Sequence, residues 1–296
     1  MQFGGSIPRV GTVLLTVNTQ DARTVERRVI ADHQHLFPSR DARRFTEHFE
    51  WVEACFLGRN PEFLPIDAAY HDLEHTLQGT LVLSELLRRR ADAGAPPTIE
   101  AEQYELSIIA ILIHDSGYLK HRGDTSGTGA KYTFTHVQRS CDFAASQLPA
   151  KGYTERQIRG IQNMIRCTGL GTSPAGIPFQ SEAERVCGFA LGTSDLVGQM
   201  AATDYPDKLP ILFAEFQEAA EFSGGSRPSM PFKTPRELMA NTHGFWRNYV
   251  IPKLETEFCG LHRFLGEPGG SSAANPYFQA IEANLERLTF LLKSGA

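Results

Sequence analysis

A histidine and an aspartate stand side by side at the end of a strongly apolar stretch. Residues 108–113 are six apolar residues in a row, and His114 and Asp115 follow them directly. Such a continuous run is typical of a buried segment rather than of an exposed helix face. Burying an imidazole beside a carboxylate costs free energy unless a partner satisfies both groups. A metal ion would satisfy them, and the alternative is that the two side chains hydrogen-bond to each other or cap the helix.

Further candidate ligands lie elsewhere in the chain. His71 and His75 are four residues apart, so a helix over about 70–90 would present both on one face. Asp195 lies inside an apolar segment, 186–200, where a carboxylate requires a buried cap, a salt-bridge partner or a metal.

These candidates together form a mixed nitrogen and oxygen ligand set. Its members are His75, His114, Asp115 and Asp195. Such a set suits one or two divalent ions, with Zn, Mn, Fe, Ni and Mg all compatible, and leaves positions open for water. Open positions favour hydrolysis over a purely structural site. His71, one helical turn from His75, would stand near the metal without binding it, where it could protonate a leaving oxygen.

Composition limits the class of protein. The 296 residues are 41% hydrophobic and 21% charged, as in ordinary globular proteins, and the net charge of -5 argues against a nucleic-acid partner held by a general basic surface. There is no transmembrane-length apolar stretch and no signal-peptide pattern at the N-terminus. The five cysteines are scattered and look like reduced thiols. We therefore expect a cytoplasmic protein without a membrane partner.

Helical periodicity dominates the chain, which predicts an all-α, compact multi-helix bundle. The predicted helices cover about 41–57, 70–90, 98–113, 134–149, 154–168, 180–200, 206–222, 235–265 and 277–293. Thr98 is the expected N-cap of its helix, and Pro252 is expected to kink the helix that contains it.

The N-terminal part has a different pattern. Residues 1–40 are expected to form an arm and lead-in, with a short strand or a packed arm at 10–17. Residues 41–296 are expected to form a single helical domain, because no linker interrupts them.

The candidate residues resemble the HD-domain metal-dependent phosphohydrolase superfamily, whose pattern is a His, then His-Asp, then a distant Asp. The similarity is greatest to the catalytic domain of cyclic-nucleotide phosphodiesterases, whose Tyr-His-Asn-x-x-His motif resembles residues 70–75, with Asp72 in place of Asn. In that family the first His is the general acid and the second is a metal ligand. The resemblance implies these roles for His71 and His75.

The same resemblance implies roles for the other ligands. The family's His-Asp pair corresponds to His114 and Asp115, with the Asp bridging two metals, and its last metal ligand corresponds to Asp195. His136 resembles the additional His that many HD proteins use for a second metal. A further His of those proteins would fall near Cys167, so the second site would depend largely on Asp115, His136 and water.

The C-terminal part of the chain resembles the family stretch that contacts the substrate. Residues 243–258 resemble a family stretch in which a Phe, here Phe245, packs against the purine. Tyr70, Thr242 and Phe245 are the expected substrate contacts. Thr242 stands where the family has the Gln that fixes the base, and Tyr118 stands where it has a His. Threonine cannot make the paired contacts of an amide, so the resemblance implies the hydrolytic centre but not cyclic-nucleotide specificity.

The implied function is hydrolysis of a small-molecule phosphodiester, nucleotide-like in the family, by a metal-activated hydroxide with His71 as general acid. Two alternatives remain open: a phosphomonoesterase or nucleotidase on the same centre, and a non-catalytic HD module that binds a nucleotide. Oxidation at a di-iron site would require more histidines around the second metal. The apolar N-terminal run and the helical surfaces permit a homodimer without requiring one.

Overall fold

A computed structural model describes residues 12, 14, 16–169, 171, 173–223, 232–267, 269–270 and 274–294. Within these residues the prediction of an all-α fold is confirmed, since the only β-type pairing is an isolated bridge between Phe63 and His121. The α-helices are α1 (Ala22–Leu36), α2 (Arg43–Phe56), α3 (Leu73–Asp92), α4 (Ala101–Leu112), α5 (His136–Gln147), α6 (Glu155–Ile165), α7 (Glu182–Ala201), α8 (Tyr205–Phe222), α9 (Pro235–Phe245) and α10 (Pro276–Ser294). None of the described helices is long and apolar enough to cross a membrane.

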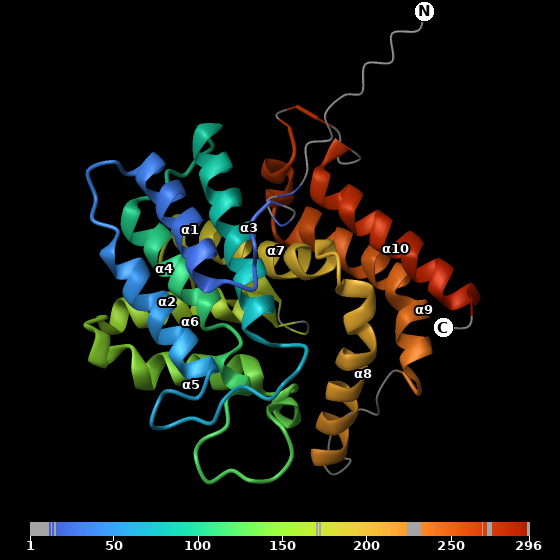
Figure 1. Ribbon diagram of the computed structural model, residues 1–296. Coiled ribbons are helices and arrows are strands. Elements are labelled where there is room, and N and C mark those ends of the chain that lie inside the picture. The colour runs from blue at the N-terminus through green and yellow to red at the C-terminus, as the bar shows by residue number, and fades with distance from the viewer. Residues whose placement is uncertain are drawn as a thin grey trace, which may run out of the picture.

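Helices α3 and α7 form the centre of the bundle (Figure 1). They approach closely because glycines meet at their crossing: a Cβ added to Gly198 would lie 3.4 Å from Cα of Gly79. Helix α4 packs against both, and its residues 108–113 are almost completely buried, as their apolar run predicts. The three helices therefore bring His75, the end of α4 and Asp195 into one buried region.

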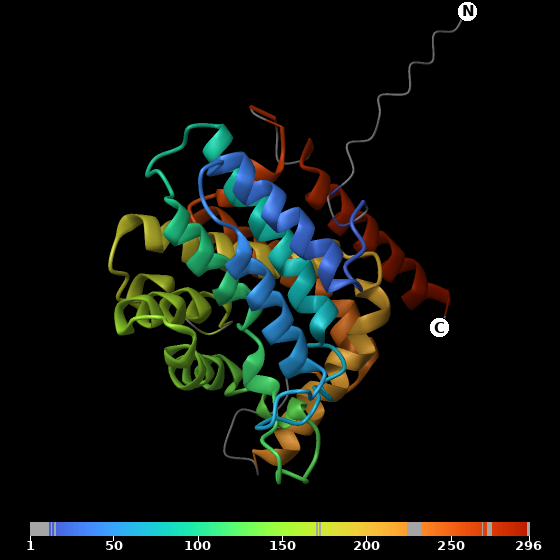
Figure 2. The same ribbon diagram turned by 60° about the vertical axis from the view of Figure 1, so that its left-hand side comes forward.

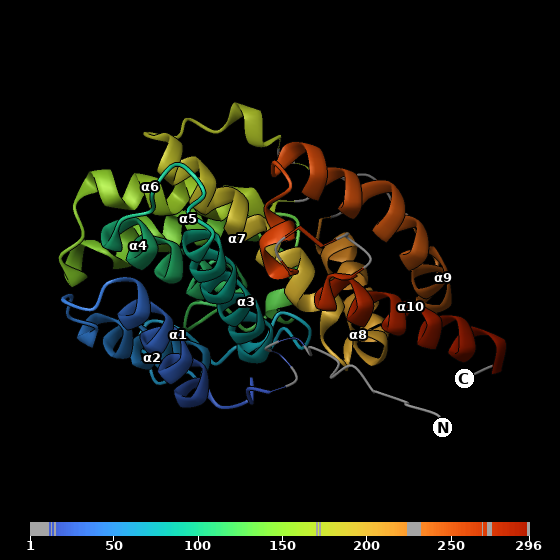
Figure 3. The ribbon, with the colours of Figure 1, turned by 90° about the horizontal axis from the view of Figure 1, so that it is seen from above.

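The other helices lie on two sides of this centre. Seen from above, α8, α9 and α10 gather on one side of α7, and α1, α2, α4, α5 and α6 lie on the other (Figure 3). The segment between α4 and α5 is tied to α8, since the Thr128 hydroxyl donates to Glu218 at 2.5 Å. Lys120 fixes the same segment to the chain before α3 through Asp67, at 2.7 Å. The first contact holds α8 beside the segment that follows α4, and the second fixes that segment in place.

Two predicted helix starts are wrong. Helix α3 begins at Leu73 rather than near residue 70, because the Asp72 carboxylate accepts a hydrogen bond from the backbone N–H of His75, at 2.8 Å, and caps the helix. Likewise α4 begins at Ala101 rather than after Thr98, because a capping box is formed by Glu100 with a glutamine three residues later. His71 therefore precedes α3 and does not share a helix face with His75.

The predicted long helix over 235–265 is helical only as far as Glu257. It consists of α9 and two π-helical turns, Trp246–Val250 and Lys253–Glu257, on either side of Pro252. Proline lacks the N–H of a normal α-helical bond, and a widened turn accommodates that loss without ending the helix. A turn at Cys259, with φ of 53°, then separates this helix from a 3₁₀ segment, Leu261–Leu265.

The N-terminal helix α1 is absent from the sequence-based expectations. It is capped by Asp21, and its Val25 and Val29 are fully buried in the same hydrophobic core as the rest of the chain. Figure 2 shows α1 lying along α3, and the two helices are in contact. The lead-in therefore contributes a core helix. The strand expected at 10–17 lies largely outside the described residues, which include only positions 12, 14, 16 and 17 of it.

Replacing Gly192 in α7 by alanine should destabilise the fold, because no space exists there for a side chain. An added Cβ would lie 2.9 Å from the carbonyl oxygen of Cys167 and 2.5 Å from the Phe258 ring. Overpacking of this kind costs about 1–3 kcal/mol, which urea unfolding would measure. Gly176→Ala is the matched control, because an added Cβ there meets nothing within 4 Å. Equal stability of the two variants would contradict this packing.

Candidate metal centre

Two imidazoles and two carboxylates converge where α3, α4 and α7 meet. Nε2 of His75 lies 3.3 Å from both Oδ2 of Asp115 and Oδ1 of Asp195. Nε2 of His114 lies 3.2 Å from the Asp115 carboxylate and 3.5 Å from that of Asp195. All four side chains are at most 10% exposed. The structure thus brings together the four residues that the sequence predicts as ligands.

Unsatisfied polar atoms mark the centre of this cluster. The Nδ1–H of His114 donates to the carbonyl oxygen of Ile111 at 2.7 Å, which leaves Nε2 as the nitrogen with a free lone pair. Nε2 of His114 and Oδ2 of Asp115 are buried and lie within ion-pair distance of each other, but neither has a partner in hydrogen-bond geometry among the described residues. A buried acceptor without a partner is costly, and a cation would satisfy both atoms. His75, His114 and Asp195 form a buried group that could hold a metal ion.

The charges within the cluster balance one another. Burial lowers the pKa of His75, but the carboxylates of Asp115 and Asp195 outweigh it and raise this pKa to about 9. Burial raises the pKa of Asp195, but His114 and His75 outweigh it and hold this pKa well below its usual range. The carboxylates are therefore anionic and require positive charge beside them, which either protonated imidazoles or a divalent cation can supply.

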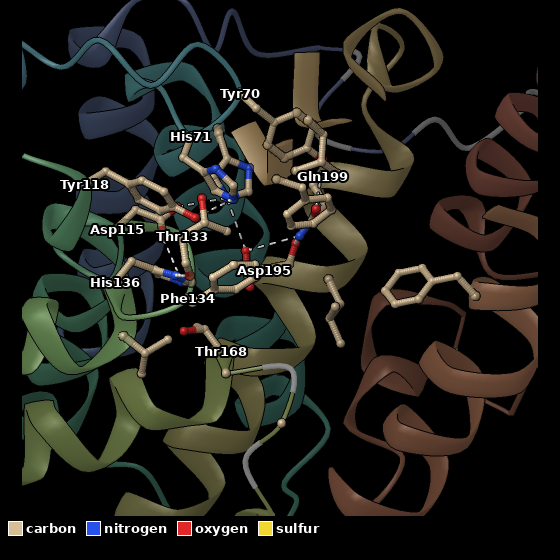
Figure 4. Close-up of a pocket in the computed structure, with 18 of the residues that line it drawn as sticks. Tyr70, His71, Asp115, Tyr118, Thr133, Phe134, His136, Thr168, Asp195 and Gln199 are labelled. Carbon is tan, nitrogen blue, oxygen red and sulfur yellow. Dashed lines mark hydrogen bonds and ion pairs between the residues drawn. The ribbon is translucent and has the colours of Figure 1, made fainter. Parts of the chain in front are cut away.

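His136 faces the second carboxylate oxygen of Asp115, Oδ1 (Figure 4). Its Nε2 lies 3.7 Å from Oδ1 of Asp115, and its Nδ1–H donates to the carbonyl oxygen of Thr133 at 2.6 Å. Burial lowers the pKa of His136, which favours the neutral imidazole that metals bind. The Thr168 hydroxyl donates to the backbone at Ile165 and adds no ligand there. Asp115 thus directs one carboxylate oxygen toward His75 and His114 and the other toward His136.

His71 is held beside the cluster by a carboxylate that the sequence did not reveal. Its Nδ1 lies 2.5 Å from Oε2 of Glu215 on α8, and the other oxygen of Glu215 accepts the backbone N–H of Tyr70 at 2.7 Å. The ring centroids of His71 and His75 are 5.6 Å apart, so the two residues are neighbours despite the later start of α3. Nothing in the local sequence distinguishes Glu215 from the other acidic residues of α8, and the pairing spans 144 positions.

Tyr118 lies between two of the histidines (Figure 4). Its ring is stacked on His71 at 4.3 Å and on His136 at 4.7 Å, measured between centroids. Its hydroxyl is 3.4 Å from Nε2 of His71. Burial and the nearby carboxylate of Asp115 raise the pKa of Tyr118 well above its usual value, so the phenol stays protonated. Tyr118 and Glu215 together fix the orientation of the His71 ring.

A cavity of about 1070 Å³ opens over the cluster and reaches from α5 to α9. The three predicted substrate contacts, Tyr70, Thr242 and Phe245, all line it. The hydroxyls of two of them already donate hydrogen bonds within the protein. Tyr70 donates to the side-chain oxygen of Gln199 at 2.8 Å, and Thr242 donates to the carbonyl oxygen of Leu238 at 3.0 Å. The Phe245 ring stacks on Tyr249 at 5.2 Å. These residues therefore shape the cavity rather than offer free polar groups.

Comparison with known proteins adds no assignment. No protein-family model matches the chain, and no curated protein matches it in sequence. The chemistry of the site must therefore be argued from its geometry.

A divalent cation should stabilise the folded chain through this cluster. At a free metal concentration of about 100 times Kd, the free energy of unfolding should rise by about 2.7 kcal/mol. Asp195→Asn should lose most of that gain, because it removes one anionic ligand. The measurement is urea unfolding with chelator or with Mn²⁺ or Zn²⁺, together with metal content per chain. Asp142→Asn, at an exposed position of α5, should respond like the unaltered chain, and an equal response of both variants would contradict the site.

Proposed function

We propose that this chain is a metal-dependent phosphoric ester hydrolase that cleaves a phosphodiester, with His71 as general acid. The observation that carries the proposal is the placement of His71, which Glu215 holds at 2.5 Å beside a buried cluster of two histidines and two aspartates. A structural metal site needs four closed ligand positions and no acid. A cluster that opens into a cavity beside an oriented imidazole fits hydrolysis instead.

The candidate ligands fit a divalent cation, which would lower the pKa of a bound water and offset charge on the phosphoryl oxygens. His75, His114 and Asp195 would hold this cation, and Asp115 and His136 would hold a second. In the reaction a water releases one proton to the solvent, its oxygen forms the new bond to phosphorus, and the bond from phosphorus to the leaving oxygen breaks. His71 gives its Nε2 proton to that leaving oxygen, so that an alcohol departs.

Glu215 and Tyr118 fix the orientation of His71. The Glu215 carboxylate accepts from Nδ1–H, so the proton to be transferred would be a second one, carried on Nε2 of the imidazolium. The side chain of His71 is 14% exposed and that of Glu215 is 4% exposed, so substrate can reach the first and water hardly reaches the second. The attraction between the Glu215 carboxylate and the Nδ1–H group of His71 is strong because little solvent screens it.

The charge of the cavity favours a diester over a monoester. Among the lining residues that the structure describes, Arg166 is the only lysine or arginine. A phosphodiester carries one negative charge, whereas a phosphomonoester carries close to two and gains more from several cations.

Turnover assays on the metal-loaded protein test the proposal. The panel should contain chromogenic phosphodiesters and phosphomonoesters, each with Mn²⁺, Zn²⁺, Ni²⁺ and Mg²⁺. We expect diesters to be cleaved with a higher kcat/KM than monoesters. Preference for monoesters would favour a phosphomonoesterase, and a metal-free protein inert toward every ester would favour a non-catalytic binding module.

His71→Asn should separate general-acid catalysis from metal binding. Loss of a positioned acid typically costs 10²–10⁴-fold in rate. We expect a loss of about that size for a phosphodiester with an alkoxide leaving group, but a much smaller one for 4-nitrophenolate, which departs without a proton. Metal content should stay unchanged, since His71 is not a ligand. His35→Asn, an exposed histidine paired with Asp92, is the control. Equal losses on both leaving groups would contradict the assignment of His71.

A further inference from the structure

The part of the cavity away from the metal cluster is almost entirely apolar. Its walls are contributed by α7, α8 and α9, which lie together in Figure 1. The apolar side chains that line it there include Leu196, Leu209, Leu212, Phe216, Leu238 and Phe245. At about 1070 Å³ the whole cavity is at the upper end of the range for small-molecule sites, about 300–1000 Å³. A phosphoryl group at the metals would leave most of this volume for the organic part of the substrate.

Three polar side chains on these walls already make hydrogen bonds within the protein. Gln199 uses both ends of its amide, accepting from Tyr70 at 2.8 Å and donating to the Asp195 carbonyl oxygen at 3.1 Å. The Thr242 hydroxyl donates to the backbone of its own helix, and the Asn241 amide donates to the Glu237 carbonyl oxygen at 2.8 Å. A nucleobase enclosed here would find few free partners for its ring nitrogens and amino groups. Each group left unsatisfied would weaken binding, because it would lose its hydrogen bonds to water without replacement.

The charge pattern also limits the ligand. Arg166 is the one basic residue among the described cavity residues, and one of its N–H groups already donates to Asn163 at 3.0 Å. A second or third phosphate group would find no further lysine or arginine along these walls. The loop lysines after the His-Asp pair do not add charge here, because Lys120 is paired with Asp67 and Lys131 with Asp124.

We propose that the organic group of the substrate is a large hydrocarbon group, an alkyl chain or a similar apolar residue, joined to a single phosphodiester. The reaction in this inference rests on the proposed hydrolase function, and the preference for a hydrocarbon group rests on the cavity walls. Phe134, which is 37% exposed, also lines the cavity and provides an apolar edge where such a group would enter. A polar nucleoside in place of the hydrocarbon group would lose the burial of apolar surface that these walls offer.

The test is a series of alkyl 4-nitrophenyl phosphodiesters, with methyl, butyl and octyl groups, on the metal-loaded protein below their critical micelle concentrations. Burial of each methylene contributes about 0.8 kcal/mol, so kcat/KM should rise about threefold to fourfold per methylene until the cavity is filled. Thymidine 5′-(4-nitrophenyl) phosphate is the polar comparison and should be cleaved less efficiently than the octyl ester. A flat series, or a preference for the thymidine ester over the octyl ester, would overturn the inference and leave the hydrolase function standing.

A pair of neighbouring positions on α8 tests the walls directly. Leu212 lines the cavity, whereas Ile211 is 37% exposed and is not among the lining residues. Leu212→Asn should reduce the increase from methyl to octyl ester at least tenfold, and Ile211→Asn should keep it. The same loss in both variants would point to a general effect on α8 and overturn the role of the wall.

Binding of alkylphosphonates separates the two proposals. Calorimetry with methylphosphonate and octylphosphonate on the metal-loaded protein needs no turnover. If no ester is cleaved but the octyl compound binds at least 100-fold more tightly than the methyl compound, the hydrolase function fails and the apolar ligand class stands. Equal affinities would overturn the ligand class whatever the activity.

Discussion

Two carboxylates buried next to two imidazoles are the strongest electrostatic constraint in this fold. Asp115 and Asp195 lie within 3.5 Å of both His75 and His114, and all four side chains are largely buried. Buried anions are tolerated only with positive charge beside them, so three helices must meet at this point with little freedom to move apart. Small residues permit that approach, since a Cβ placed on Gly79 would come 3.9 Å from Cα of Asp195.

The site divides its tasks between the buried core and the cavity surface. The ligand candidates come from the central helices α3 and α7 and from the buried turn that follows α4, where packing restrains their side chains. The candidate acid, His71, comes from the segment before α3 and depends on Glu215 of α8 for its orientation. The segment between α4 and α5 in turn fixes α8 through Thr128 and Glu218. Peripheral contacts thus align the acid with a cluster that the core defines.

Sequence analysis predicted the cluster because polar residues are conspicuous in apolar surroundings. His114, Asp115 and Asp195 each interrupt a hydrophobic stretch, which is a strong local signal. Glu215 carries no such signal, because its importance arises only when α8 folds back over a residue 144 positions earlier. The sequence places the start of α3 too early, because Asp72 caps the N-terminus of the helix within a stretch whose pattern is helical throughout. The sequence also did not predict that the Thr242 hydroxyl donates to the backbone at Leu238, because the backbone geometry determines that partner.

The central claim is that His75, His114 and Asp195, with Asp115 beside them, bind a divalent cation. X-ray absorption spectroscopy of the chain loaded with one equivalent of Zn²⁺ tests it most directly. The account predicts a first shell of nitrogen and oxygen only, at about 2.0–2.2 Å, with the outer-shell scattering of two imidazoles, and loss of one imidazole contribution in His114→Ala. A sulfur shell at about 2.3 Å, or a spectrum unchanged in His114→Ala, would contradict it.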